Sequence, residues 1–153
     1  MNARALFRMS VVAVLLSPVW VAAQIYTFNP LPDLAPVDIS LGGDCRIMVT
    51  LTNNGPAMMP SSAYVGPATG IQMYKDGAPW GGNALQGVDP AKALQPPGGS
   101  VNYLWFGGAV TPNLLVTPGQ HTIRVEVDNN NIVLESNEAN NNLTKPLRAG
   151  SRG

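Results

Sequence analysis

Cysteine and histidine are almost absent from this sequence, which holds one of each among its 153 residues. Because Cys45 is alone, no disulfide can form within the chain, and a hydrophobic core must hold the fold by itself. We expect Cys45 to be a buried apolar residue of a strand, although an exposed thiol would allow a disulfide-linked dimer. A catalytic or metal-binding His121 would need partner side chains that the sequence does not offer, so we expect a partly buried structural histidine at a strand start.

Charged side chains are also scarce, at 12% of the chain, and the two signs balance. No basic patch is present that would attract nucleic acid or anionic lipid, so both partner classes are excluded. The motifs of serine hydrolases, zinc proteases and nucleotide-binding enzymes are missing, and no facing pair of carboxylates can be assigned. The chain is therefore predicted to be non-enzymatic and to need no cofactor, apart from the calcium ion considered below.

Long hydrophobic segments are missing outside the N-terminus. There, two arginines precede an apolar stretch at residues 10–16, and small residues at 21–23 follow it, which is the pattern of a secretory signal peptide over residues 1–23. Pro18 interrupts the apolar run, which is shorter than the roughly 20 residues that a membrane-spanning helix needs. We expect cleavage after Ala23 and a secreted or periplasmic protein without stable membrane insertion; an uncleaved inner-membrane anchor is the alternative.

After an extended leader at residues 24–32, apolar side chains recur at every second position, the period of strands with one face in a core. We expect strand material at residues 34–41, 45–52, 70–75, 100–107, 121–127, 132–134 and 143–147. Pro36 fits only an edge strand or a kinked one. Asp76-Gly77 is a favoured hairpin turn. About seven short strands without a helical period predict an all-β, immunoglobulin-like antiparallel sandwich.

Several short motifs resemble one known family. They are Pro32-Asp33-Leu34, Asn53-Asn54-Gly55, Tyr74-Lys75-Asp76-Gly77, the segments 94–100 and 118–123, and Glu135-Ser136-Asn137-Glu138-Ala139-Asn140-Asn141. Together they resemble CARDB, the cell-adhesion-related domain found in bacteria, over residues 33–147, with 148–153 left as a flexible tail. The resemblance implies a seven-stranded immunoglobulin-like sandwich, a module that is usually one of several in large surface proteins. We expect a single copy here.

Two connections depart from the compact form of that family. Residues 78–97, rich in Gly, Pro and Ala, form a long connection with room for one short strand, and residues 107–118 form a second long loop. Loops at the ends of a sandwich are where binding surfaces are commonly built. These insertions are therefore candidates for the specific function of the protein.

Aromatic side chains are candidate ligand-binding groups. Trp80 lies in a Gly-Pro-rich segment, where its ring is suited to stacking on a sugar or anchoring an interface, or equally to closing an open end of the sandwich. Tyr74 and Trp105 are further candidates for ligand contact. The aromatic run at residues 103–106 is otherwise expected to supply core.

Hard oxygen ligands gather near the C-terminus, where a calcium ion is one hypothesis. The candidate ligands are Asp128, Asn129, Asn131, Glu135 and Glu138, with Asn137, Asn140 and Asn141 close in sequence. They lack the spacing of an EF-hand loop. The structural alternative is that the asparagines bond the turn backbone and the two glutamates tie neighbouring strands together.

The sequence as a whole predicts a secreted or periplasmic binding and adhesion module that recognises a protein or a carbohydrate at the cell surface. One alternative is a structural subunit that self-associates by pairing of exposed strand edges, with residues 24–38 as the donor strand. Another is a calcium-stabilised surface module.

Overall fold

The computed structural model describes residues 29–66, 69–105 and 116–150. The expected signal peptide, most of the leader, most of the 107–118 loop and the last residues of the tail lie outside these ranges. No helix among the described residues is long and apolar enough to cross a membrane.

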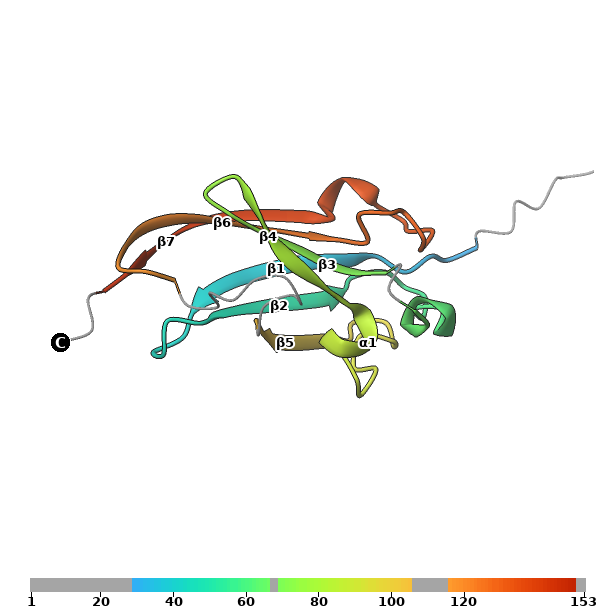
Figure 1. Cartoon of the computed structure of the whole chain (residues 1–153). Helices are drawn as coiled ribbons and strands as arrows, with labels where there is room; N and C mark the ends of the chain where they lie inside the picture. Colours follow the sequence, from blue (N-terminus) through green and yellow to red (C-terminus); the bar gives the residue numbers. More distant parts are fainter. Residues whose placement is uncertain (1–28, 67–68, 106–115, 151–153) are drawn as a thin grey trace, which may run out of the picture.

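Seven strands form two antiparallel sheets that pack face to face (Figure 1). One sheet has the order β1-β2-β5, and the other has the order β4-β3-β6-β7. The strands are β1 Leu34–Leu41, β2 Ile47–Asn53, β3 Gly70–Lys75, β4 Ala78–Ala84, β5 Ser100–Leu104, β6 Gly119–Val127 and β7 Asn142–Ala149. The predicted all-β, immunoglobulin-like sandwich is confirmed.

β1 and β2 follow from their sequence alternation. In β2, residues at every second position from Ile47 to Asn53 are buried, while the residues between them are partly exposed. β1 is an edge strand, and its register with β2 shifts between Pro36 and Asp38. An edge position and a local bulge are the two settings in which a strand tolerates proline, so the prediction for Pro36 is confirmed.

The sequence allowed one short strand within residues 78–97 but did not place β4. Residues 78–84 contain a proline and two adjacent glycines, which argue against a strand, yet they pair with β3 along its whole length. The pairing is possible because β4 lies at the edge of its sheet and its register shifts at Met73/Tyr74, beside Gly81, which has a φ of 101°. The Asp76-Gly77 turn joins the two strands as predicted. A short helix, α1 Leu85–Val88, follows β4.

The second correction concerns residues 132–134. We expected them to supply strand material, but they form a loop, and β7 Asn142–Ala149 alone returns along β6. Asp128 explains the loop, because its carboxylate accepts hydrogen bonds from the backbone N–H groups of Ile132 (3.2 Å) and Val133 (2.8 Å). These backbone donors are therefore not available to a neighbouring strand.

Buried polar side chains hold the long connections. Asn53 Oδ1 accepts hydrogen bonds from the N–H groups of Asp33 and Gly55, and its Nδ2 donates to the carbonyl oxygens of Ala57 and Pro96. This one side chain thus ties three separate segments together at one end of the sandwich.

Asp89 plays the same part in the 85–99 connection. The Asp89 carboxylate is fully buried and accepts hydrogen bonds from the Ala93 and Leu94 N–H groups and from the Tyr64 hydroxyl. Tyr64 belongs to a 3₁₀ turn, η1 Ser61–Tyr64, so the two connections are fastened to each other. Buried hydrogen bonds therefore hold these two connections in place.

Candidate functional site

Three surface depressions lie at one end of the sandwich. We call it the Leu34 end, because β1 begins there, and the opposite end the Leu41 end. The Leu34 end carries the 53–69, 84–99 and 128–141 connections, on the right-hand side of Figure 1. Each depression is lined by residues of these connections or of the adjoining strand ends. The candidate recognition surface is therefore the Leu34 end.

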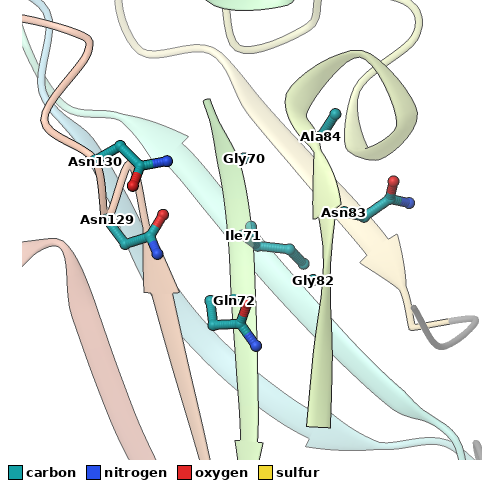
Figure 2. A pocket seen from close by; sticks show the side chains of 8 residues that line it. All are labelled: Gly70, Ile71, Gln72, Gly82, Asn83, Ala84, Asn129 and Asn130. Atoms are coloured by element: carbon teal, nitrogen blue, oxygen red, sulfur yellow. The ribbon is translucent and has the colours of Figure 1, made fainter. Parts of the chain in front are cut away.

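The first of them, the amide depression, encloses about 260 Å³ and has no charged side chain in its lining. It is lined by Gly70, Ile71, Gln72, Gly82, Asn83, Ala84, Asn129 and Asn130 (Figure 2). The amides of Asn129 and Asn130 project from the turn after β6, beside the start of β3. The lining therefore offers hydrogen-bond donors and acceptors without net charge.

Two close contacts shape the amide depression. A Cβ added to Gly82 would lie 2.6 Å from the carbonyl oxygen of Ile71, and one added to Gly70 would lie 2.1 Å from that of Asn83. Gln72 Nε2 donates to the carbonyl oxygen of Gly81 at 2.8 Å, which holds the Gln72 side chain across β4. The hollow thus depends on glycines where the two strands pass each other.

The second depression has a mixed lining that includes two charged residues, Asp89 and Lys92. It also encloses about 260 Å³ and is lined by Ser61, Tyr64, Val65, Gln86, Asp89, Pro90 and Lys92. Both carboxylate oxygens of Asp89 already accept hydrogen bonds within the protein. The Lys92 ammonium lies 5.5 Å from the centre of the Tyr64 ring. Hydrogen bonding to Asp89 and, above all, burial raise the pKa of the Tyr64 hydroxyl.

The aromatic residues proposed from the sequence are placed differently. Trp80 (4% exposed) and Trp105 (0% exposed) belong to the core, with ring centres 6.0 Å apart. A buried ring offers no face to a sugar, so Trp80 takes the structural role that was its alternative. Tyr74 is partly exposed, but the Arg124 guanidinium covers its ring at 3.8 Å and its hydroxyl donates to Glu126 at 2.9 Å.

The calcium ligands proposed from the sequence differ in whether their oxygens already accept hydrogen bonds within the protein. Both oxygens of Asp128 are taken by backbone N–H groups. Glu138 Oε1 accepts from the Glu135 N–H at 3.1 Å, and its Oε2 accepts from Asn141 Nδ2 at 3.2 Å. Asn129 and Asn131 are exposed. In the described part of the chain, no group of three or more His, Cys, Asp and Glu side chains is placed to hold a metal ion.

Glu135 ties two distant segments, as the structural alternative predicted for it. Its Oε1 accepts a hydrogen bond from the Leu34 N–H at 2.9 Å, across 101 positions of sequence, and so fastens the 128–141 loop to the start of β1. Burial raises the pKa of the Glu135 carboxyl to about 7, opposed by the Leu34 N–H and the adjacent Asn141 side chain. No donor reaches Oε2 in hydrogen-bond geometry, which leaves a buried acceptor unpaired.

His121 is partly buried at the start of β6, as predicted, but the fold gives it partners that sequence reasoning missed. His121 Nδ1 lies 2.6 Å from Asp76 Oδ2, and Nε2 lies 3.1 Å from Thr117 Oγ1. This connectivity resembles a catalytic triad. However, Nε2 also lies 3.0 Å from the Thr117 carbonyl oxygen, which only accepts. The three residues join the β3–β4 turn to the start of β6 and form a clamp at the Leu41 end.

The prediction for Cys45 was wrong. Cys45 precedes β2 in the turn after β1, is partly exposed, and has a φ of 63°. The alternation of β2 suggested a core position, but the strand begins only at Ile47.

Comparisons with known proteins agree with the fold and the motifs. The sequence profile of CARDB matches residues 32–145. The chain belongs to the CARDB family. CARDB domains are non-enzymatic modules with an adhesion-related role. No curated protein matches the sequence.

Two solved CARDB-like structures are similar to this chain. One is the solution structure of a domain from a Methanosarcina acetivorans protein that is named as a candidate cell surface protein. It is 22% identical to this chain, with a TM-score of 0.55, and the match covers 80% of this chain and 95% of that one. A crystal structure of the CARDB domain of a Pyrococcus furiosus protein, in complex with di-metal ions, is 24% identical, with a TM-score of 0.48 and coverage of 77% and 88%. At 22% identity, the likeness to the Methanosarcina acetivorans domain supports the fold alone.

Proposed function

We propose that this CARDB domain is a secreted or periplasmic, non-enzymatic adhesion module that recognises a surface glycan with its amide depression. The observation that carries the proposal is a hollow lined by amides and free of charged side chains. A sugar hydroxyl both donates and accepts hydrogen bonds, as a primary amide does, and an uncharged lining imposes no desolvation of charge on an uncharged ligand.

The size of the hollow also limits its ligand. Pockets for drug-sized molecules enclose roughly 300–1,000 Å³, and the amide depression encloses about 260 Å³. A single sugar ring at the end of a glycan fits this volume better than an extended chain. Export would place the module where such glycans occur.

Glycan-array binding by the wild-type protein tests this function, together with a Gln72→Ala/Asn129→Ala double variant. The double variant removes amides from the depression and is expected to lose binding by about tenfold or more, which corresponds to roughly 1.4 kcal/mol. Asn102→Ala on the opposite sheet is the control and should bind like the wild type. Equal binding by all three proteins would contradict the proposal.

A protein ligand is the second candidate function. It is favoured by exposed apolar side chains in the connections of the Leu34 end, namely Met58 (62%), Val65 (75%), Ile132 (53%) and Leu134 (72%). Exposed apolar groups of this kind are common in protein interfaces. Absence of glycan binding combined with capture of a surface protein that depends on Leu134 would favour this candidate.

A further inference from the structure

Residues 135–141, which we call the Glu135 loop, hold an unusual concentration of buried oxygens that accept no hydrogen bond. These are Glu135 Oε2, Asn140 Oδ1 and Asn141 Oδ1. Glu135 is buried, with only 5% of its surface exposed. Buried acceptors are nearly always paired, so three without a protein donor within seven residues point to a partner from solution, an ion or a water.

The orientation of the two amides is fixed by their neighbours. Asn140 Nδ2 donates to Asp33 Oδ1 at 2.8 Å, and Asn141 Nδ2 donates to Glu138 Oε2 at 3.2 Å. A carboxylate only accepts, so turning either amide around would set two acceptors against each other. Both Oδ1 atoms are therefore true unpaired acceptors.

Hydrogen bonds connect the residues that carry these oxygens to one another and to the start of β1. Glu135 accepts from the Leu34 N–H, while Asp33, next to Leu34, accepts from Asn140. On the other side, Glu138 accepts both from the Glu135 N–H and from Asn141. The Asn141 side chain also lies close enough to Glu135 to oppose the rise of its carboxyl pKa.

The surroundings are negatively charged. Four carboxylates lie in or beside the Glu135 loop, and all their observed hydrogen-bond donors are neutral. They are those of Asp33, Asp128, Glu135 and Glu138. The ion pairs observed among the described residues lie elsewhere. A cavity of about 210 Å³ leads from solvent to Glu138 and Asn141. Excess negative charge with unpaired oxygens favours a cation over a neutral partner.

We propose that the Glu135 loop binds a calcium ion through Glu135 Oε2, Asn140 Oδ1 and Asn141 Oδ1, and thereby fastens the loop to the start of β1. A set made only of carboxylate and amide oxygens suits a hard cation, and calcium accepts the irregular geometry that water must complete. With one carboxylate among three ligands, the affinity is expected in the range of extracellular modules, about 10⁻⁴–10⁻³ M. This site differs from the one proposed by sequence, because Asp128 and Glu138 only support it.

Calorimetric titration of the full chain with calcium chloride, after removal of bound metal with EGTA, tests the proposal. We expect saturable binding, together with a melting temperature about 5 °C higher at ten times the dissociation constant than in EGTA. Magnesium, which demands near-octahedral geometry, should bind more weakly. Absence of binding and an unchanged melting temperature in calcium would overturn the proposal and leave a protonated Glu135 as the explanation of the unpaired oxygens.

Two variants separate metal binding from simple destabilisation. In Glu135→Gln, the new amide can still accept from the Leu34 N–H and can donate to an unpaired asparagine oxygen, so we expect normal folding in EGTA without calcium binding. Asn141→Ala removes one ligand and should weaken binding at least tenfold. Asp38→Asn removes a carboxylate that pairs with Lys145 at 2.7 Å, far from the loop, and should bind calcium like the wild type. Wild-type affinity in Glu135→Gln would also overturn the proposal.

Discussion

Asp76 connects the β3–β4 turn to the start of β6 through two different hydrogen bonds. Its Oδ1 accepts from the Thr122 N–H at 2.8 Å, and its Oδ2 faces His121 Nδ1. The hydrogen bond from His121 is the larger cause that lowers the pKa of the Asp76 carboxyl, and the Thr122 N–H is the next. Both bonds favour the ionised carboxylate in the folded state.

Replacing Asp76 with asparagine is therefore expected to destabilise the protein only where Asp76 is ionised. A carboxylate with a lowered folded pKa stabilises the fold above its unfolded value of 3.8, and this contribution is lost as the pH falls through the folded value. Urea denaturation should show a gap in unfolding free energy between the wild type and Asp76→Asn at about pH 6 that narrows as the pH falls below 3.8 and closes once the folded carboxyl is protonated. A gap that did not narrow with falling pH would mean that the residue acts through packing and not through charge.

Single residues also show why the ligands of the proposed calcium site could be predicted only in part. Composition alone pointed to the acidic and amide side chains after β6, since these are calcium ligands. Which oxygens are already used depends on bonds across the whole chain, such as Glu135 to Leu34 and Asn140 to Asp33. Such long-range pairings leave no local signal in the sequence.

At the scale of elements, the strands that alternate strictly were predictable. β2 and β6 bury every second residue along most of their length, because each has one face in the core. β4 could not be placed within residues 78–97, where one short strand was expected at most, because Pro79, Gly81 and Gly82 disfavour a strand by propensity. Tertiary pairing with β3 overrides that preference. Conversely, residues 132–134 have strand-like side chains, but the Asp128 carboxylate occupies their backbone donors.

The segment before β1 is packed against the turn after β2. A Cβ on Gly55 would lie 2.4 Å from the Leu31 carbonyl oxygen and 2.5 Å from the carbonyl carbon of Pro32. The Asn54 N–H donates to the Asp33 carbonyl oxygen at 2.7 Å, and the Ser136 N–H donates to that of Pro32 at 2.8 Å. Residues 31–33 are thus held within their own domain, which opposes the alternative in which the whole of residues 24–38 pairs with a neighbouring copy.

Gly55→Ala should test this packing. Because the added methyl group meets backbone atoms that cannot move independently, we expect a loss of about 1–3 kcal/mol in unfolding free energy. Gly43→Ala is the matched control, since nothing lies within 4 Å of its added Cβ, and it should change stability by less than about 0.5 kcal/mol. If chemical denaturation gave the same stability for the two variants, residues 31–33 would not be packed on Gly55 in solution.

For the whole molecule, the expected signal peptide would determine where the module acts. We expect the mature protein recovered outside the cytoplasm to begin at Gln24, because small residues at the preceding positions suit signal peptidase. N-terminal sequencing or intact mass measurement checks this. Ala23→Arg places a large charged side chain at the cleavage position and should retain the leader. A mature wild-type protein that still began at Met1 would support the uncleaved anchor instead.

The two ends of the described domain lie at opposite ends of the sandwich, which has a mechanical consequence. β1 starts at the Leu34 end, and β7 finishes at the Leu41 end, where Ala149 pairs with Gly119 (Figure 1). A pulling force between a surface attachment and the C-terminus would act along the strands. Because interstrand hydrogen bonds run across the strands, such a force loads the β1–β2 and β6–β7 ladders in shear, many bonds at once. The domain is therefore built to carry tension without peeling open one bond at a time.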